Sequence, residues 1–219
     1  MRLSNQVRRL LSLIMAVAIC MSVLPWTVLA ADSVTVAEWI YTAEPTGGLP
    51  AAATGGANNT GATLELSGAT YNKFSSKSIS GKGWSVGGYW LLTLDTTGYE
   101  NLTFSASLRS SKTGPANFKL QYQLSGTDTW TDIEGGTATA TDSLKQAVTD
   151  VALPAAVSNV AGVKLRVLVA DNASVNGGTI AATGTSNINS ITITGTAAVV
   201  EPAGVVKVDG LTNLYKVYM

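Results

Sequence analysis

Apolar and polar residues alternate strictly in several separate stretches of the chain. The clearest are residues 102–108, 118–124 and 163–169. A period of two places every second side chain on the same face of an extended backbone. Each stretch is therefore predicted to be a strand with one buried and one solvent-facing side, which favours antiparallel over parallel sheets. In the second stretch, Tyr122 falls on the predicted core face and Gln121 on the opposite face.

Turn-forming residues separate these stretches, and Gly114-Pro115 between the first two predicts a hairpin. Residues 45–61, rich in Gly, Ala, Thr and Asn, are expected to form a long loop, and residues 142–150 are the one helical candidate. The further predicted strands are residues 34–41, with Glu38 at a bulge, 84–95, 130–134 and 191–193. About eight to ten short strands predict an all-β protein, an antiparallel two-sheet β-sandwich of jelly-roll-like form.

The composition excludes several classes of function. The chain has 219 residues, a formal net charge of 0 and 13% charged residues. This charge is too low for a nucleic-acid-binding protein that relies on a basic surface, so no nucleic-acid partner is expected. There is no histidine. Catalysis by Ser-His-Asp or Cys-His and metal sites with histidine ligands are therefore excluded, and we expect a protein that is not an enzyme.

The first 30 residues have the features of a signal peptide. Arg8 and Arg9 precede the mostly apolar residues 10–23, and Val28-Leu29-Ala30 fits a small-x-small cleavage site. The apolar run is shorter than the ~20 residues of a membrane-spanning helix, so cleavage is favoured over an uncleaved anchor. A lipoprotein signal at Cys20 is disfavoured because Ile19, which precedes it, is not small. We expect a secreted or cell-surface bacterial protein with no membrane span after cleavage.

Cleavage would leave a chain that begins at Ala31 and contains no cysteine. A secreted protein without disulfides must be held together by its hydrophobic core. The expected organisation is a signal peptide at residues 1–30, a β-sandwich domain at residues 31–197, and a linker with the start of a further segment or a truncated tail at residues 198–219. Whether the chain is a fragment of a longer protein is left open.

Aromatic residues among glycines are the first candidates for ligand contact. Trp84 and Tyr89 lie beside Gly83, Gly87 and Gly88, near a predicted strand end. If these rings are exposed, they form a platform on which a sugar ring can stack. If they are buried, they belong to the core. The other tryptophans of the predicted domain, which are Trp39, Trp90 and Trp130, are most simply explained as core or packing residues.

Oxygen-bearing side chains are weaker candidates. Asp171 and Asn172 end a predicted strand and could contribute to a structural calcium site, although turn formation is the simpler explanation. A carboxylate pair could hydrolyse a glycoside without histidine, but no glycosidase signature surrounds the acidic residues. These acidic residues are Asp95, Glu100, Asp128, Asp132 and Glu134. Four basic residues on predicted polar strand faces could form a mildly basic patch: Arg109, Lys119, Lys164 and Arg166.

Three stretches of the chain, residues 88–102, 109–115 and 118–131, together resemble a known type of module. They are similar to the jelly-roll-like accessory modules of large secreted and surface-layer proteins of Gram-positive bacteria. The resemblance covers roughly residues 32–197 and rests mainly on turn and core residues. It implies the fold more than an activity. Such modules often precede nuclease, phosphoesterase or glycan-active domains.

These observations lead to one main hypothesis and two alternatives. The chain is expected to be a non-catalytic, exported β-sandwich module that binds a carbohydrate or a cell-wall polymer at the cell surface. One alternative is a structural spacer or assembly module with no ligand. The other is the N-terminal fragment of a larger secreted nuclease, phosphoesterase or glycan-active hydrolase.

Overall fold

The computed structural model describes residues 32–143 and 145–198. The predicted signal peptide and nearly all of the predicted C-terminal tail lie outside the described residues. The described part is built from β-strands, and its one helical element is a 3₁₀ turn, η1 (Ala155–Val157). Within these residues, no helix has the length and apolar character needed to cross a membrane.

Six strands form the first sheet, here called sheet 1. They run in the order β10-β7-β12-β5-β4, and β1 also pairs with β12. All pairings in this sheet are antiparallel. Its strands are β1 (Val34–Trp39), β4 (Thr70–Ser75), β5 (Ser78–Lys82), β7 (Tyr99–Ser110), β10 (Lys145–Ala152) and β12 (Thr185–Ala197).

The other six strands form sheet 2, in the order β2-β3-β6-β11-β8-β9. Every pairing in sheet 2 is antiparallel as well. Its strands are β2 (Ala51–Ala52), β3 (Thr63–Ser67), β6 (Tyr89–Leu94), β8 (Asn117–Gln123), β9 (Thr131–Thr139) and β11 (Val163–Val169).

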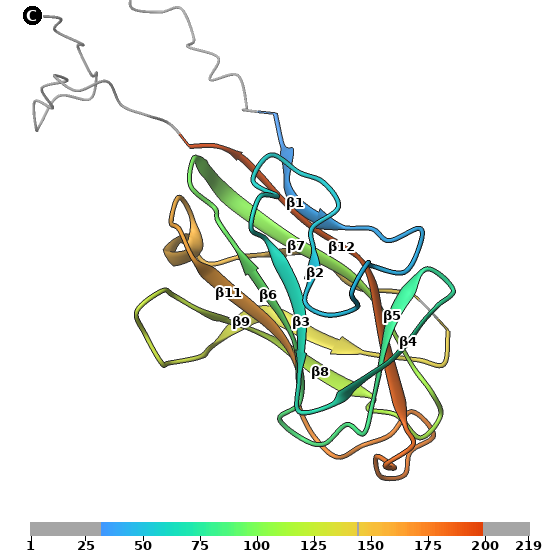
Figure 1. Cartoon of the computed structure of the whole chain (residues 1–219). Helices are drawn as coiled ribbons and strands as arrows, with labels where there is room; N and C mark the ends of the chain where they lie inside the picture. Colours follow the sequence, from blue (N-terminus) through green and yellow to red (C-terminus); the bar gives the residue numbers. More distant parts are fainter. Residues whose placement is uncertain (1–31, 144, 199–219) are drawn as a thin grey trace, which may run out of the picture. The chain divides into compact units, whose positions relative to one another are not determined.

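The chain passes repeatedly from one sheet to the other, so that the central strands of each sheet have neighbours that are distant in sequence (Figure 1). Strand β11 lies between β6 and β8, while β12 lies between β7 and β5. This interleaved order is that of a jelly roll built from two antiparallel sheets. The prediction of an all-β, two-sheet sandwich is therefore confirmed.

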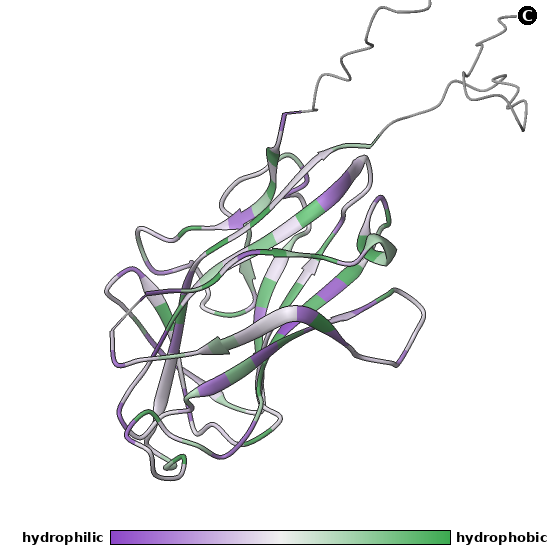
Figure 2. Ribbon diagram, turned by 180° about the vertical axis from the view of Figure 1, so that it is seen from behind, coloured by the Kyte–Doolittle hydropathy of each residue, from purple (hydrophilic) through white to green (hydrophobic). Residues whose placement is uncertain are grey.

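The predicted alternation places the core between the two sheets. Along β7 and β11, every second side chain is buried in one continuous hydrophobic cluster, and Figure 2 shows the resulting alternation of colour along the strands. Phe118 and Leu120 of β8 are buried in the same core, and Tyr122 packs partly buried against it. Gln121 lies on the opposite face, as predicted. The expectation that it faces solvent is wrong, since only 7% of its surface is exposed.

Several local predictions differ from the structure. Residues 145–152 form the edge strand β10, so the helical interpretation of residues 142–150 is wrong. Strand β10 pairs with β7, and Val148 is buried against the core; the β-branched Val148, Thr149 and Val151 favour a strand over a helix. The bulge of the first strand lies between Thr35 and Ala37 and not at Glu38. The predicted long loop contains the short strand β2.

Candidate functional site

Trp84 is a core residue. Its side chain is 4% exposed, and its indole Nε1 donates a hydrogen bond to the Gly81 carbonyl oxygen at 2.9 Å. Its ring lies 5.2 Å from that of Trp90 between ring centroids. The condition for an exposed stacking platform is therefore not met at Trp84, and the prediction of this residue as a ligand contact is wrong.

The glycines near Trp84 have a packing role. A Cβ atom built on Gly81 would lie 2.8 Å from the indole ring, and one on Gly88 would lie 3.2 Å from it. Both positions must therefore lack a side chain so that the indole can pack closely against the backbone. Of the three glycines that suggested an accessible ligand site, Gly88 makes room for the buried ring, whereas Gly83 and Gly87 have positive φ in open space and serve the turn.

Tyr89 lies apart from Trp84. It is the first residue of β6, it is partly exposed, and it alternates with the buried Trp90. Its ring lies 6.2 Å from that of Trp130, between centroids, and the two rings are tilted by 46°. Tyr89 is thus on the outer face of sheet 2, while Trp84 packs into the core against Trp90.

Strand register brings residues from five strands into one row across this outer face. Arg166 of β11 is paired with Leu91 of β6 on one side and with Gln121 of β8 on the other. Leu91 is paired in turn with Glu65 of β3, and Gln121 with Asp132 of β9. We call the outer surface formed by this row, together with Tyr89 and Trp130, the β6–β11 face. Paired residues of antiparallel strands point to the same side of a sheet, so these side chains share one surface.

Arg166 is the centre of the β6–β11 face. Its guanidinium carbon lies 4.0 Å from the centre of the Trp130 ring and 5.0 Å from that of Tyr89. Both distances lie within the range of cation–π contact. The arginine is thus stacked between aromatic rings that come from β6 and from the residue preceding β9.

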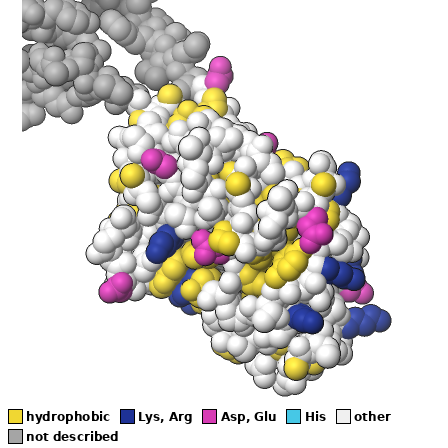
Figure 3. All heavy atoms as spheres, in the orientation of Figure 1, with side chains coloured by type: hydrophobic (Ala, Val, Ile, Leu, Met, Phe, Trp, Pro, Cys, Tyr) yellow, Lys and Arg dark blue, Asp and Glu magenta, His cyan; other side chains and the backbone are white. Residues whose placement is uncertain are grey.

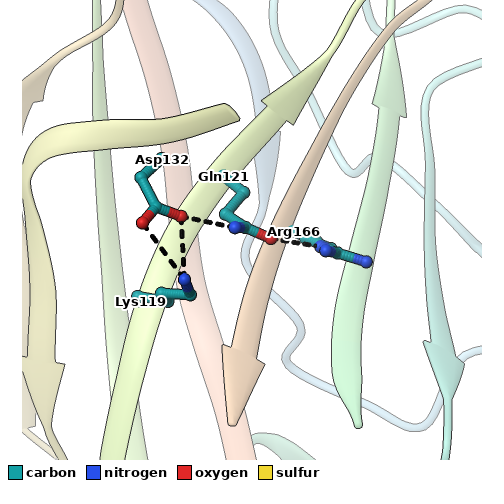
Figure 4. Close-up of polar contacts among 4 residues, drawn as sticks. All are labelled: Lys119, Gln121, Asp132 and Arg166. Carbon is teal, nitrogen blue, oxygen red and sulfur yellow. Dashed lines mark hydrogen bonds and ion pairs between the residues drawn. The ribbon is translucent and has the colours of Figure 1, made fainter. Parts of the chain in front are cut away.

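A chain of polar contacts holds the guanidinium in place (Figure 4). Arg166 Nε donates a hydrogen bond to Gln121 Oε1 at 2.7 Å. Gln121 Nε2 donates to Asp132 Oδ1, and Lys119 Nζ donates to Asp132 Oδ2 at 3.1 Å, the last pair also forming an ion pair. The arginine and the aspartate are therefore joined through a neutral amide and not by direct contact.

The surroundings shift the pKa of both charged ends of this chain. The hydrogen bond from Gln121, supported by that from Lys119, lowers the pKa of Asp132, which keeps its carboxylate ionised at neutral pH. Burial lowers the pKa of Arg166, because removal of water disfavours the charged form, and the Tyr89 hydroxyl beside the guanidinium partly opposes this effect. Arginine remains charged at physiological pH even so.

The face combines apolar and polar groups. Leu91 and Leu168 lie partly exposed beside the aromatic rings. In Figure 3, hydrophobic side chains gather over the middle of the visible face, with basic and acidic side chains next to them. Such a surface can pack against the C–H face of a sugar ring while its donors and acceptors bind hydroxyl groups.

The predicted basic patch is formed in part. Lys119, Lys164 and Arg166 project from the same face of sheet 2, whereas Arg109 lies on β7 in sheet 1. Sequence reasoning assigned Trp130 to packing and Arg166 to a solvated face, and it did not bring the two together. Their contact depends on the pairing of β8 with β9 and with β11. The hairpin predicted between residues 102–108 and 118–124 is wrong, because β7 and β8 belong to different sheets.

The predicted calcium residues act in a turn. Asp171 Oδ1 accepts a hydrogen bond from the Ala173 backbone N–H at 2.9 Å, and Oδ2 accepts one from Asn117 Nδ2 at 2.9 Å. The Asn172 carbonyl oxygen accepts a hydrogen bond from the Ile180 backbone N–H. In the described residues, no group of three or more Asp, Glu, His or Cys side chains could hold a metal ion. The Asp171 carboxylate thus stabilises its own turn through Ala173 and ties that turn to β8 through Asn117.

The acidic residues considered for hydrolysis have structural contacts. Asp95 Oδ1 accepts a hydrogen bond from the Thr97 backbone N–H at 2.7 Å, and the Thr97 side chain together with this backbone contact lowers the pKa of Asp95. Asp132 is paired with Lys119. Neither contact creates the combination of one raised and one low pKa that an acid/base pair requires.

Comparison with known proteins adds no assignment. No protein-family model matches the chain, and no curated protein matches it. The function is therefore inferred from the β6–β11 face itself.

Proposed function

We propose that this protein is a non-catalytic, exported β-sandwich module that binds a carbohydrate or a cell-wall polymer at the bacterial cell surface. The observation that supports this function is the partly exposed cluster of Tyr89, Arg166 and Trp130 on the β6–β11 face. The proposal keeps the ligand class expected from the sequence and moves the site from Trp84 to Trp130.

The physical basis of binding is the difference between the two sides of the Trp130 ring. Arg166 covers one side of the indole, which orients the ring and leaves its other side as the stacking surface for a ligand. Polar side chains along the same row can then bind sugar hydroxyls. Stacking on one or two rings gives weak binding, on the order of micromolar to millimolar Kd. Repeated units of a polymer and many copies of the module would raise the overall affinity.

The proposed location at the cell surface rests on the predicted signal peptide and on the resemblance to Gram-positive accessory modules. In this role the module would keep the protein attached to the polymer that it binds. N-terminal sequencing of the protein from culture supernatant or cell wall is expected to start at or within a few residues of Ala31. An intact Met1 on a membrane-bound species would contradict export.

The binding function is tested by retention on a panel of immobilised polysaccharides and purified cell wall. The protein is expected to be retained by at least one polymer, and Trp130→Ala is expected to weaken retention about tenfold or more, the equivalent of ~1.4 kcal/mol. Trp130→Phe keeps an aromatic ring and is expected to retain most of the binding. Ile40→Ala, at a residue of the β1 side that is 43% exposed, serves as the control and is expected to bind like the unchanged protein.

Two results would count against the proposal. If no polymer retains the unchanged protein, the spacer alternative is favoured. If Trp130→Ala binds as well as the unchanged protein, the β6–β11 face is not the binding surface. Melting temperatures of all variants, measured in parallel, separate a loss of binding from a loss of folding.

A further inference from the structure

Arg166 has no carboxylate partner among residues 32–143 and 145–198. The one ion pair in this part of the chain joins Lys119 to Asp132. The contacts of the Arg166 side chain are two aromatic rings, the neutral amide of Gln121 and the Tyr89 hydroxyl. The Asp132 carboxylate attracts Arg166 only from beyond Gln121, without direct contact, so this partly buried cation keeps an attraction for a further anion.

The geometry leaves a defined part of the guanidinium available. The hydrogen bond to Gln121 uses Nε. In Figure 4 the guanidinium lies on the side of Gln121 that is away from Asp132, and the hydrogen bond to Gln121 leaves its two terminal nitrogens for other partners. These two nitrogens carry coplanar N–H groups in the fixed fork that matches the two oxygens of a carboxylate.

The side chain is also held in place before any ligand binds. Stacking on Trp130 and the hydrogen bond to Gln121 restrict rotamers that a free surface arginine would populate. Ordering a long side chain on binding has an entropic cost, and here the fold has already ordered the side chain. A prearranged cation of this kind favours an anion over a neutral group.

The charges around Arg166 agree with this preference. The ion pair with Lys119 neutralises Asp132. Lys164 lies two residues from Arg166 on the same face of β11, and Glu65 lies two strands away, where it accepts a hydrogen bond from Thr63. Counted together, Lys119, Lys164 and Arg166 outnumber Asp132 and Glu65 by one charge, so this face carries a small positive excess. This small excess of positive charge favours a singly charged ligand group over a doubly charged one.

We propose that Arg166 binds the carboxylate of a sugar acid, and that the ligand of the β6–β11 face is therefore a polysaccharide that contains uronic acid. This inference rests on the proposed carbohydrate-binding function and narrows its ligand class. The sugar ring stacks beside the aromatic residues, and its carboxylate forms two parallel hydrogen bonds with the terminal nitrogens of Arg166. A neutral residue at position 121 leaves the guanidinium available for the ligand, because an acidic residue there would form an ion pair with Arg166.

The test compares two ligands that differ only in charge. Isothermal titration with oligogalacturonate and with its carboxyl-reduced counterpart is expected to show at least tenfold tighter binding of the acidic form. Arg166→Gln is expected to remove this difference. Arg109→Gln removes the same charge from a strand of sheet 1, and it is expected to preserve the difference.

A second variant keeps the arginine and changes its partner. Gln121→Glu places a carboxylate at the position that accepts the hydrogen bond from Arg166 Nε, and it is expected to reduce the preference for the acidic ligand. Melting temperatures identify any loss of folding, because the new carboxylate also lies beside Asp132. If both variants are folded and both still bind the acidic oligosaccharide more tightly than the neutral one to the full extent, the inference is overturned.

The outcomes separate this inference from the proposed function. Equal binding of the acidic and the neutral oligosaccharide would overturn the role of Arg166 and leave carbohydrate binding intact. Tighter binding of poly(glycerol phosphate) than of oligogalacturonate would overturn the choice of a carboxylate. Absence of binding to any polysaccharide or cell-wall polymer would overturn both the proposed function and the inference.

Discussion

Replacing Trp84 with alanine is expected to destabilise the domain by about 3–5 kcal/mol, the usual cost of removing a buried aromatic ring. The indole is 4% exposed, packs against Trp90 and donates a hydrogen bond to the Gly81 carbonyl oxygen. Its removal leaves a cavity beside Trp90 and an unpaired carbonyl. Since domains are commonly stable by only 5–15 kcal/mol, a large part of the total stability is lost. Chemical denaturation monitored by far-UV circular dichroism measures this loss.

Val86 provides the matched control for Trp84. It lies two residues further along the same turn, and 52% of its surface is exposed. Val86→Ala is therefore expected to change the free energy of unfolding by no more than about 0.5 kcal/mol. A Trp84→Ala variant as stable as Val86→Ala would show that Trp84 is not part of the core.

Thr96→Val is expected to cost about 2–4 kcal/mol although valine has nearly the same shape as threonine. Thr96 is fully buried, and its Oγ1 lies 2.6 Å from the Val157 carbonyl oxygen and 2.8 Å from that of Val160. The same atom accepts a hydrogen bond from the Val160 backbone N–H at 3.1 Å. The hydroxyl thus joins the end of β6 to the segment that follows η1, and valine leaves these backbone groups buried without that partner.

An exposed threonine tests whether this cost arises from burial. Thr149 lies on the edge strand β10 with its side chain exposed, and Thr149→Val is expected to change stability by less than about 0.5 kcal/mol. Both variants are compared by thermal and chemical denaturation. Equal stability of Thr96→Val and the unchanged protein would show that the buried hydroxyl contributes nothing to the connection.

The strands that could be predicted from sequence are those whose two faces differ strongly. Residues 102–108 and 163–169 alternate between core and solvent because each sheet covers the core with one face only. The β4–β5 hairpin lacked such a signal. Its turn is formed by Ser76 and Lys77, both with positive φ, 53° and 58°, where Asn-Gly is the usual sequence. Tertiary pairing therefore imposes a turn that local preference does not indicate.

The individual residues of the β6–β11 face could be predicted from sequence, but their arrangement could not. The alternation of β11 places Arg166 on a polar face, but it does not show which strands lie on either side. Strand β11 lies between β6 and β8 in sheet 2, although 68 residues separate it from the end of β6 and 39 residues separate it from the end of β8. The clustering of glycines near Trp84 suggested exposure, whereas Gly88 and the nearby Gly81 permit the indole to pack closely against the backbone. Short-range sequence thus identified the residue types, and long-range register determined which of them meet.

The most direct test of the β6–β11 face as the binding surface is an NMR titration of the ¹⁵N-labelled protein with a polysaccharide fragment that it retains. The indole N–H resonance of Trp130 is expected to shift during the titration. Those of Trp39, Trp84 and Trp90, whose rings are buried, serve as internal controls and are expected to stay in place. Shifts confined to residues of sheet 1, with the Trp130 resonance unchanged at saturation, would contradict the assignment of the binding surface.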